Sequence, residues 1–497
     1  MLRTPGLVLC ATLSTLLAPW VEARGQSDGA AVAIRQGEGG PRLVSQPRAD
    51  YKARRQAVMK RIREIEQWDL VEPEQAKSRA RSERRAAPVV VLIGQDESAY
   101  SPIGEGRYRQ KNDFVYLTGV EAPSAGLILL PGEDRETLYL PPSRGRSLEE
   151  APEVAPGARA AEKLGFERVA STAEFLAELF SAIADPRVQR YGRSAIVYVN
   201  KPGSGSDSPF VRFLREGAPN AEVKDLSPIL GELRKAKTET EIALLRKAIA
   251  ITGAAQREVA AMIRPGLFEY ELEGKIIGTF TAQGAERAGF SSIVGSGPNS
   301  TIPHYFANRR KLEAGDLVVV DIGAEFQYYT ADITRTYPAS GTFSSRQREI
   351  YQLVLDVQSR CAQRVKPGVT TLREMTSWAR EAFRESPLTA KDREGREQSI
   401  DHFFIHGLGH YLGMDVHDVG DTGKALQPGE VFTIEPGLYI PSENLGVRIE
   451  DDYLVTDLGL EKLSEAIPSD PDSIERQIAA ARAGARAAAG ADGESRP

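Results

Sequence analysis

The sequence predicts a two-domain protein of the α/β class, in which an N-terminal α/β domain precedes a C-terminal α+β domain. At 497 residues the chain is too long for a single hydrophobic core. Apolar strands alternate with helical segments up to residue 230, and helices alternate with strands of two-residue period from residue 237 onward. These patterns place the two domains at residues 46–230 and 237–465.

The first residues are typical of a protein that is exported from the cytoplasm. Arg3 precedes the uncharged apolar run Gly6–Trp20, and Val21–Ala23 provides a small-residue cleavage site, so residues 1–23 are predicted to be a signal peptide. An uncleaved anchor is the alternative, but the run is short for a membrane span of about 20 residues. Residues 24–45 are expected to form a flexible leader. We therefore expect a periplasmic or secreted protein with no stable membrane span after cleavage.

The charge and cysteine content narrow the class of protein further. The formal net charge of -6 gives no electrostatic reason to expect a nucleic acid partner. Cys10 lies in the predicted signal peptide, so only Cys361 would remain after cleavage and no intramolecular disulfide could form. Cys361 falls within a helical apolar pattern, which indicates packing rather than catalysis.

The N-terminal domain begins with a basic amphipathic helix and continues with strands and helices in alternation. Helices are predicted at Tyr51–Ile65 and Ala173–Ile183, and strands at Val89–Ile93, Phe114–Leu117, Gly126–Leu130 and Leu138–Leu140. The C-terminal domain opens at Thr238–Glu241, a capping box in which two side chains bond free amides at a helix start. Arg264–Gly266 ends that helical pattern. Residues 473–497 have almost no large apolar side chains and are predicted to be a disordered tail.

Histidines are concentrated in one short segment of the second domain. All five lie in that domain, and four fall between residues 402 and 417, which is typical of a functional site. His406 and His410 have the spacing of a helical zinc motif, but Gly407 stands where that motif needs a glutamate. An extended segment, with His406, Leu408 and His410 on one face, fits better. The five are His304, His402, His406, His410 and His417.

Two aspartates are predicted to meet on a hairpin. Asp321 ends an apolar strand that begins at residue 317, and residues 330–337, which include Asp332, alternate with a period of two. A connection through residues 324–328 would bring the two carboxylates together, where they would repel each other. A divalent cation would remove that conflict.

Two glutamates follow strands of similar character. Glu435 comes directly after the apolar strand Val431–Ile434, and alternation places Arg448 and Glu450 on one face of the next strand. Arg448 could simply pair with Glu450, or its guanidinium could bind a substrate carboxylate through two parallel hydrogen bonds.

Four carboxylates and one imidazole suit a pair of hard or borderline divalent ions. We expect Mn²⁺ as the preferred ion, with Zn²⁺, Co²⁺ and Fe²⁺ as alternatives. Two ions about 3.5–4 Å apart can share a water, lower its pKa and stabilise a tetrahedral oxyanion. The sequence therefore predicts a two-metal hydrolase with the ligands Asp321, Asp332, His410, Glu435 and Glu450.

The order of these ligands, with the two aspartates eleven positions apart, resembles the pita-bread metallopeptidases, which include methionine aminopeptidase, prolidase and aminopeptidase P. The strings HGLGHYLGMDVHDVG, TIEPGLYI, GVRIEDD and QKNDFVYLTG are most similar to bacterial aminopeptidase P, and the resemblance covers residues 50–465. It implies a creatinase/prolidase-type N-terminal domain and a pita-bread catalytic domain.

The resemblance also implies a role for each ligand. Asp321 would bind one ion and His410 the other, while Asp332 and Glu450 would bridge the pair. Glu435 would complete the site and act as the base that takes the proton of a bridging water.

The same resemblance implies a peptide substrate with proline at its second position. His304 and His417 would orient the scissile carbonyl and stabilise the intermediate, and His406 and Arg448 would line the pocket that accepts proline. The first residue would be removed by attack of a metal-bridging hydroxide. A homodimer or homotetramer is expected by analogy alone.

Three other functions stay open. Prolidase cleaves Xaa-Pro dipeptides on the same scaffold, and fold alone does not separate the two activities. Metal-free creatinase-like hydrolases and non-catalytic binding proteins share the fold but normally lose several ligands, whereas all five are present here. Predicted export favours peptide processing outside the cytoplasm, and hence the aminopeptidase.

Overall fold

Two units make up the part of the chain that the structure, a computed structural model, describes. It covers residues 42–43, 46–66, 88–95, 108–142, 155–184, 195–200 and 208–493, with side chains up to residue 484. The border between the units falls between Ile229 and Leu230. The predicted signal peptide and most of the predicted leader lie outside the described residues.

The first unit is built on a six-stranded mixed sheet in the order β6-β5-β4-β2-β7-β8. Its strands are parallel to their neighbours except β4, which is antiparallel to both β2 and β5. The predicted strands at Val89–Ile93, Gly126–Leu130 and Leu138–Leu140 are confirmed. The strands span Pro88–Ile93 (β2), Gly126–Leu130 (β4), Arg135–Leu140 (β5), Arg168–Ser171 (β6), Ile196–Val199 (β7) and Glu222–Asp225 (β8).

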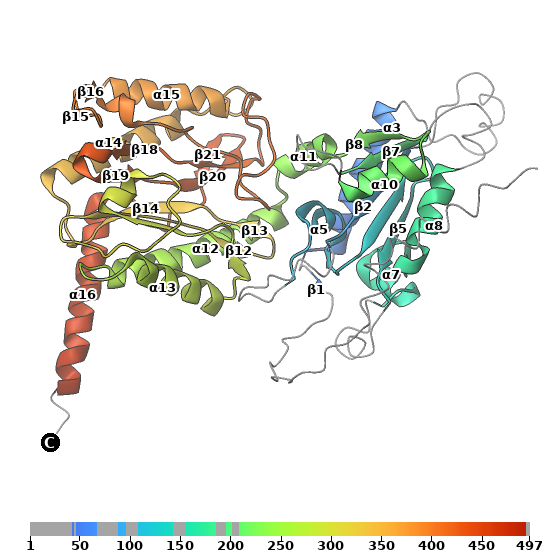
Figure 1. Cartoon of the computed structure of the whole chain (residues 1–497), viewed down its shortest axis with the longest axis horizontal. Helices are drawn as coiled ribbons and strands as arrows, with labels where there is room; N and C mark the ends of the chain where they lie inside the picture. Colours follow the sequence, from blue (N-terminus) through green and yellow to red (C-terminus); the bar gives the residue numbers. More distant parts are fainter. Residues whose placement is uncertain are drawn as a thin grey trace, which may run out of the picture. The chain divides into compact units, whose positions relative to one another are not determined.

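Helices pack around this sheet (Figure 1). The best-defined start is that of α8, where the Ser171 hydroxyl and the Glu174 carboxylate form a capping box. Phe175 of this helix packs edge-on against Tyr139 of β5, with ring centroids 5.1 Å apart. The helices span Arg48–Ile65 (α3), Asn112–Thr118 (α5), Ala158–Leu164 (α7), Thr172–Ile183 (α8) and Pro209–Gly217 (α10), and the short strands Arg42–Leu43 (β1) and Val120–Glu121 (β3) pair with each other.

The strand predicted over Phe114–Leu117 is wrong, because these residues lie in helix α5. Gly119 ends the helix in a left-handed conformation with φ of 67°. Two buried arginines of α3, Arg54 and Arg55, donate to carbonyls in the last turn of α5 at 3.1 and 2.9 Å. A short apolar run fits a strand or a helix equally well, and here hydrogen bonds from a distant helix favour the helix.

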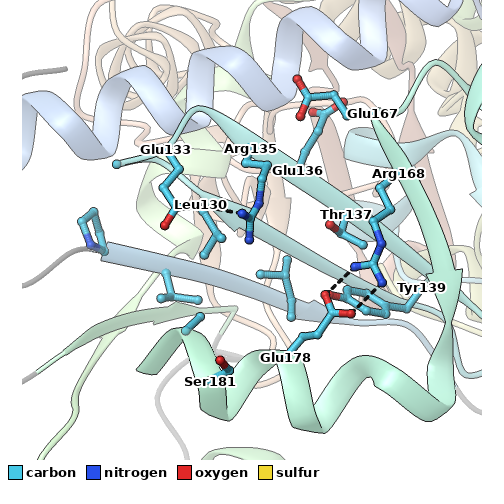
Figure 2. A pocket seen from close by; sticks show the side chains of 15 residues that line it. Leu130, Glu133, Arg135, Glu136, Thr137, Tyr139, Glu167, Arg168, Glu178 and Ser181 are labelled. Atoms are coloured by element: carbon cyan, nitrogen blue, oxygen red, sulfur yellow. Dashed lines mark hydrogen bonds and ion pairs between the residues drawn. The ribbon is translucent and has the colours of Figure 1, made fainter. Parts of the chain in front are cut away.

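A cavity of about 740 Å³ opens on the first unit between the sheet and α8 (Figure 2). Charged side chains on its wall pair with one another. Arg168 bonds both carboxylate oxygens of Glu178 at 2.5 and 2.7 Å, and Arg135 lies 2.9 Å from Glu133. The cavity wall is thus occupied by internal ion pairs, and the predicted metal ligands all lie in the other unit.

The second unit holds its strands in several small sheets, in the orders β10-β11-β14, β17-β20-β21, β13-β12-β9, β18-β19 and β15-β16. Figure 1 shows the central strands between the helix pair α12 and α13 and the pair α14 and α15. The strands span Arg287–Ala288 (β9), Ile293–Ser296 (β10), Leu317–Ile322 (β11), Ala324–Phe326 (β12), Tyr329–Thr330 (β13), Ile333–Pro338 (β14), Thr389–Lys391 (β15), Glu397–Ser399 (β16), Val431–Ile434 (β17), Gly437–Ile440 (β18), Leu445–Arg448 (β19), Asp451–Thr456 (β20) and Gly459–Lys462 (β21).

The predicted capping box at the start of the second unit is confirmed. The Thr238 hydroxyl accepts from the Glu241 N–H at 3.3 Å, and the Glu241 carboxylate accepts from the Thr238 N–H at 2.8 Å. Among the described helices, none combines the length with the apolar composition that a membrane crossing requires. The helices are Ser227–Lys235 (α11), Glu239–Met262 (α12), Glu269–Ala282 (α13), Ser345–Arg364 (α14), Leu372–Arg384 (α15) and Pro471–Gly493 (α16), with short 3₁₀ turns at Gly297–Thr301 (η3), Ile400–Phe403 (η4) and Pro441–Glu443 (η5).

The disordered tail predicted over residues 473–497 is wrong where the structure describes it, because α16 forms there. Ile474 and Ile478, one helical turn apart, are 0% and 1% exposed and belong to the main core of the unit. Arg482 donates to three main-chain carbonyls of the unit at 2.7, 3.0 and 3.1 Å. Two isoleucines on one face and the bonds of Arg482 anchor this alanine-rich helix, and average composition does not reveal such contacts.

Replacing Ile474 with Ala should lower the free energy of unfolding by about 2–5 kcal/mol, because a buried side chain is truncated and a cavity remains. Urea unfolding followed by circular dichroism measures this loss. Arg476→Ala, on the exposed face of the same helix, is the control and should change the free energy of unfolding by less than about 0.5 kcal/mol. Equal midpoints for the two variants would show that α16 adds nothing to the core.

Candidate metal centre

Of the two predicted aspartates, one lies in β11 and the other directly before its paired strand β14. These strands are antiparallel neighbours and place Asp321 opposite Thr334, while Asp332 directly precedes β14. The predicted pairing is therefore confirmed. The connection is more elaborate than predicted, because the intervening residues form a second small hairpin from β12 and β13.

Gly323 explains how the chain can cross itself so closely beside these aspartates. A Cβ atom at this position would lie 1.8 Å from the carbonyl oxygen of Ala331, so only glycine fits. The close crossing also brings Asp321 near enough for its charge to raise the pKa of Asp332.

The segment around His410 runs extended beside β17, as the sequence predicts. Thr433 donates its N–H to the His410 carbonyl at 2.9 Å, and Glu435 donates to the Leu408 carbonyl at 2.8 Å. A Cβ atom at Gly409 would lie 1.9 Å from the Thr433 carbonyl oxygen. The glycine that argues against a helix is thus the residue that lets the two extended segments meet.

The tautomer of His410 directs one ring nitrogen toward the acids. Nδ1 lies 3.1 Å from the Tyr411 carbonyl oxygen, which can only accept, so Nδ1 carries the proton. Nε2 then faces Asp332 Oδ2 at 3.4 Å, Glu435 Oε1 at 3.5 Å and Glu450 Oε1 at 4.0 Å. An imidazole held through one nitrogen, with the other facing carboxylates, has the arrangement of a metal-ligating histidine.

Glu450 reaches the same cluster from the two-residue link between β19 and β20. Its N–H donates to the Thr334 carbonyl at 3.1 Å, and its Oε2 accepts from the Thr334 hydroxyl at 2.7 Å. One ligand atom each from Asp332, His410 and Glu450 lie within 4.8 Å of one another. The five predicted ligands are therefore brought together by the fold.

The acids of this cluster repel one another unless a cation is bound. Burial, followed by the charges of Asp321, Asp452 and Glu435, raises the pKa of Asp332 well above the ordinary range. Burial and the neighbouring Asp332 and Glu435 raise the pKa of Glu450 in the same way. Among the described residues, no donor reaches the buried Oδ1 of either Asp321 or Asp332. The residues present thus fit divalent cations, which would neutralise the acids and take up the free oxygens.

Arg448 pairs with Asp321 rather than with Glu450. Its Nη2 lies 2.7 Å from Asp321 Oδ2, its Nη1 donates to the Tyr439 hydroxyl at 2.8 Å, and its Nε donates to the Thr334 hydroxyl at 3.2 Å. The side chain is buried, so these contacts hold a predicted ligand in place. A direct contact between Arg448 and the substrate stays a prediction.

Both ring nitrogens of His406 are engaged within the protein. Nδ1 lies 2.7 Å from the Gly407 carbonyl oxygen and must donate to it, which leaves Nε2 to accept from the Tyr439 hydroxyl at 2.9 Å. Burial lowers the pKa of His406, in agreement with a neutral ring. A hydrogen-bonded chain therefore runs from His406 through Tyr439 and Arg448 to Asp321.

The three remaining histidines, His304, His402 and His417, all have exposed side chains. His417 stacks on His410, with ring centroids 3.9 Å apart and planes 18° apart. Burial, followed by the charge of His410, lowers the pKa of His417. His304 is exposed and stacks on Phe306 with centroids 6.2 Å apart. Its charge contributes to lowering the pKa of both His406 and His417, so these histidines share one neighbourhood.

Two site residues escaped prediction although the sequence carries a signal for each. Tyr439 follows Gly437 on the same face of β18, and a Cβ atom at Gly437 would lie 2.6 Å from the Tyr439 hydroxyl. The glycine thus leaves room for the phenol to reach across the strand pair. Asp452, two residues after Glu450, is fully buried and accepts the Asp332 N–H at 3.3 Å.

The fold and this cluster of buried carboxylates around a histidine define a metal-dependent hydrolase. Residues 243–457 match metallopeptidase family M24, and residues 51–189 match the N-terminal domain of aminopeptidase P. The chain therefore belongs to metallopeptidase family M24, and it is a metallo-aminopeptidase. The expected order of an N-terminal α/β domain and a pita-bread catalytic domain is confirmed.

Relatives match over most of their length. The chain is 34% identical to an Xaa-Pro aminopeptidase from Escherichia coli (strain K12), over 79% of the chain and 94% of the relative. It is 32% identical to an Xaa-Pro dipeptidase from Pyrococcus horikoshii, over 71% of the chain and 91% of the relative. A solved structure of proline aminopeptidase P II from Yersinia pestis superposes with a TM-score of 0.72 at 32% identity, covering 87% of this chain and all of the other (100%).

The contribution of Asp332 and Glu450 to the stability of the metal-free protein should be lost as the pH rises above the ordinary carboxyl pKa of about 4. The pKa values of Asp332 and Glu450 are raised in the folded state, so the folded protein binds more protons than the unfolded chain and deprotonation favours unfolding. Added Mn²⁺ should reverse the loss, by about 2.7 kcal/mol at 100 times its Kd. Calorimetry with and without Mn²⁺ measures both effects.

Asp332→Asn provides the matched comparison, because it removes one of the repelling acids. This variant should show a shallower pH dependence without metal and a smaller gain from Mn²⁺. A wild-type protein with the same pH dependence as Asp332→Asn and no response to Mn²⁺ would contradict the assignment of a metal centre.

Proposed function

We propose that the protein removes the N-terminal residue from peptides whose second residue is proline. One observation carries the proposal: five ligand-type side chains meet on the framework of an aminopeptidase P. The Xaa-Pro aminopeptidase of Escherichia coli, aligned over 94% of its own length, supports the same activity.

Asp321, Asp332, His410, Glu435 and Glu450 would hold two divalent ions. We favour Mn²⁺ because the set is rich in carboxylates and lacks thiolates. Such ions, when bound, polarise a carbonyl group and lower the pKa of a water.

Glu435 is the predicted ligand with the most open side. Its side chain is 18% exposed, against 6% for Asp332 and 2% for Glu450. A water that arrives from solvent would therefore meet Glu435 first among these acids. Its carboxylate is placed to take the proton of that water as general base.

Two histidines would bind the scissile carbonyl group. His304 and His417 can each donate a ring N–H to its oxygen as negative charge develops there. Because both nitrogens of His406 are engaged in the protein, this ring would meet a proline through its carbon atoms. Such an apolar contact suits proline, whose nitrogen carries no hydrogen. Peptidases that hydrogen-bond the N–H of the scissile amide cannot bind it in their usual way.

We also propose that the protein is exported and that it assembles as a homodimer or homotetramer. Export is supported by Arg3 and the apolar run Gly6–Trp20, which precede a small-residue cleavage site at Val21–Ala23. Assembly is proposed by analogy with the family.

Glu435→Gln should lower kcat by about 10²–10⁴-fold, because the amide cannot accept the proton of the water. The substitution keeps the size of the side chain, so the melting temperature should change little. Metal content, measured on the same samples, separates a lost base from a lost ion. Glu461→Gln, on the surface strand β21, is the control; a Glu435→Gln enzyme with the kcat of this control would remove Glu435 from the mechanism.

The second candidate function is that of an Xaa-Pro dipeptidase, because the chain is similar to such an enzyme from Pyrococcus horikoshii. Substrate length distinguishes the two activities. An aminopeptidase should release the first residue of Xaa-Pro-Yaa tripeptides faster than it cleaves Xaa-Pro dipeptides. Exclusive cleavage of dipeptides would reassign the protein as a dipeptidase. Activity on either substrate should disappear with a chelator and return with Mn²⁺.

A further inference from the structure

We propose that the hydrogen bond from the Tyr305 hydroxyl to the buried Glu269 carboxylate positions His304 for the reaction. The inference rests on the role in orienting the scissile carbonyl proposed above for His304. Glu269 and Tyr305 belong to neither the ligand set nor the proposed substrate contacts, so their effect would pass through the adjacent histidine.

Glu269 is a fully buried carboxylate that accepts hydrogen bonds from four residues. Oε1 accepts from the N–H and hydroxyl of Ser296 at 2.8 and 2.7 Å and from the Asn299 amide at 3.1 Å. Oε2 accepts from the Tyr305 hydroxyl and the Arg310 N–H, both at 2.8 Å. Every one of these groups donates, so only a side chain that accepts on both oxygens satisfies them all. The first turn of α13 also favours the negative charge.

His304 lies between two side-chain anchors. Residues 302–310 form neither helix nor strand, and the His304 side chain is exposed. On one side of it, the Pro303 carbonyl accepts from Arg448 Nη2 at 3.3 Å. On the other side, the Tyr305 hydroxyl donates to Glu269. The buried Asn308 holds the far end of this segment through the Val294 N–H and the Ser292 carbonyl, and the two anchors are the side-chain bonds next to the imidazole.

Both anchors connect the segment of His304 to β11, the strand that carries Asp321. Arg448 bonds Asp321 directly at 2.7 Å. Glu269 bonds Ser296, the last residue of β10, which pairs with Val318 of β11. The Glu269–Tyr305 bond therefore closes a framework that sets the position of His304 relative to the metal centre.

Tyr305→Phe leaves the ring and removes the hydroxyl, which makes the bond to Glu269 and a longer one, at 3.4 Å, from the Arg309 N–H. The kcat for an Xaa-Pro-Yaa tripeptide should fall about tenfold, while KM and Mn²⁺ content stay unchanged. Tyr270→Phe, which removes a hydroxyl from a 40% exposed tyrosine beside Glu269 on the same helix, is the control and should keep the wild-type kcat.

A double-mutant cycle with His304→Ala separates positioning from a general loss of structure. If the bond acts through His304, Tyr305→Phe has its full effect in the wild-type background and no further effect when His304 is already alanine. An equal loss of kcat in both backgrounds would overturn the inference, and so would an unchanged kcat in the single variant. Unchanged turnover in His304→Ala alone would instead refute the role proposed for His304.

Discussion

A buried arginine holds together the backbone from which the acids of the metal centre project. Arg335 is fully buried, and its guanidinium donates to the carbonyls of Thr334 and Glu450, to two carbonyls in residues 467–468, and to the Asp451 carboxylate at 2.7 Å. An isolated charge in this place would be strongly destabilising, but every N–H has a partner and an opposite charge is present. Because this group bonds both β14 and the start of β20, the Asp332 and Glu450 carboxylates keep their relative positions.

Local signals in the sequence predict those parts of the fold whose cause is local. The capping box at Thr238 predicts the start of α12, because both partners lie within one helical turn. Helices α5 and α16 were missed for the opposite reason. The first depends on Arg54 and Arg55, more than fifty residues earlier, and the second on two isoleucines that find a core assembled from distant segments. Neither cause is visible in a window of neighbouring residues.

In the candidate site, too, local features could be predicted from the sequence, whereas contacts between distant segments could not. Each predicted ligand stands at a strand end or beside a glycine, so residue type and position sufficed to propose the set. The partners of those ligands could not be foreseen, because they depend on which strands become neighbours. Arg448 shares a strand face with Glu450 yet bonds Asp321, and Tyr439 connects it to His406. Such contacts depend on the pairing of β18 with β19 and on the packing of β19 against β11, not on any one strand.

The glycines at 323 and 409 restrict the chain as tightly as the ligands do. At either place one added methyl group would collide with a carbonyl oxygen, at 1.8 or 1.9 Å, and the ligand-bearing segments would have to separate. A variant could therefore keep all five ligands and still lose its activity through a single glycine-to-alanine substitution at either position. A test for whether a protein of this fold can be active should therefore check for glycine at these two positions as well as for the five ligands.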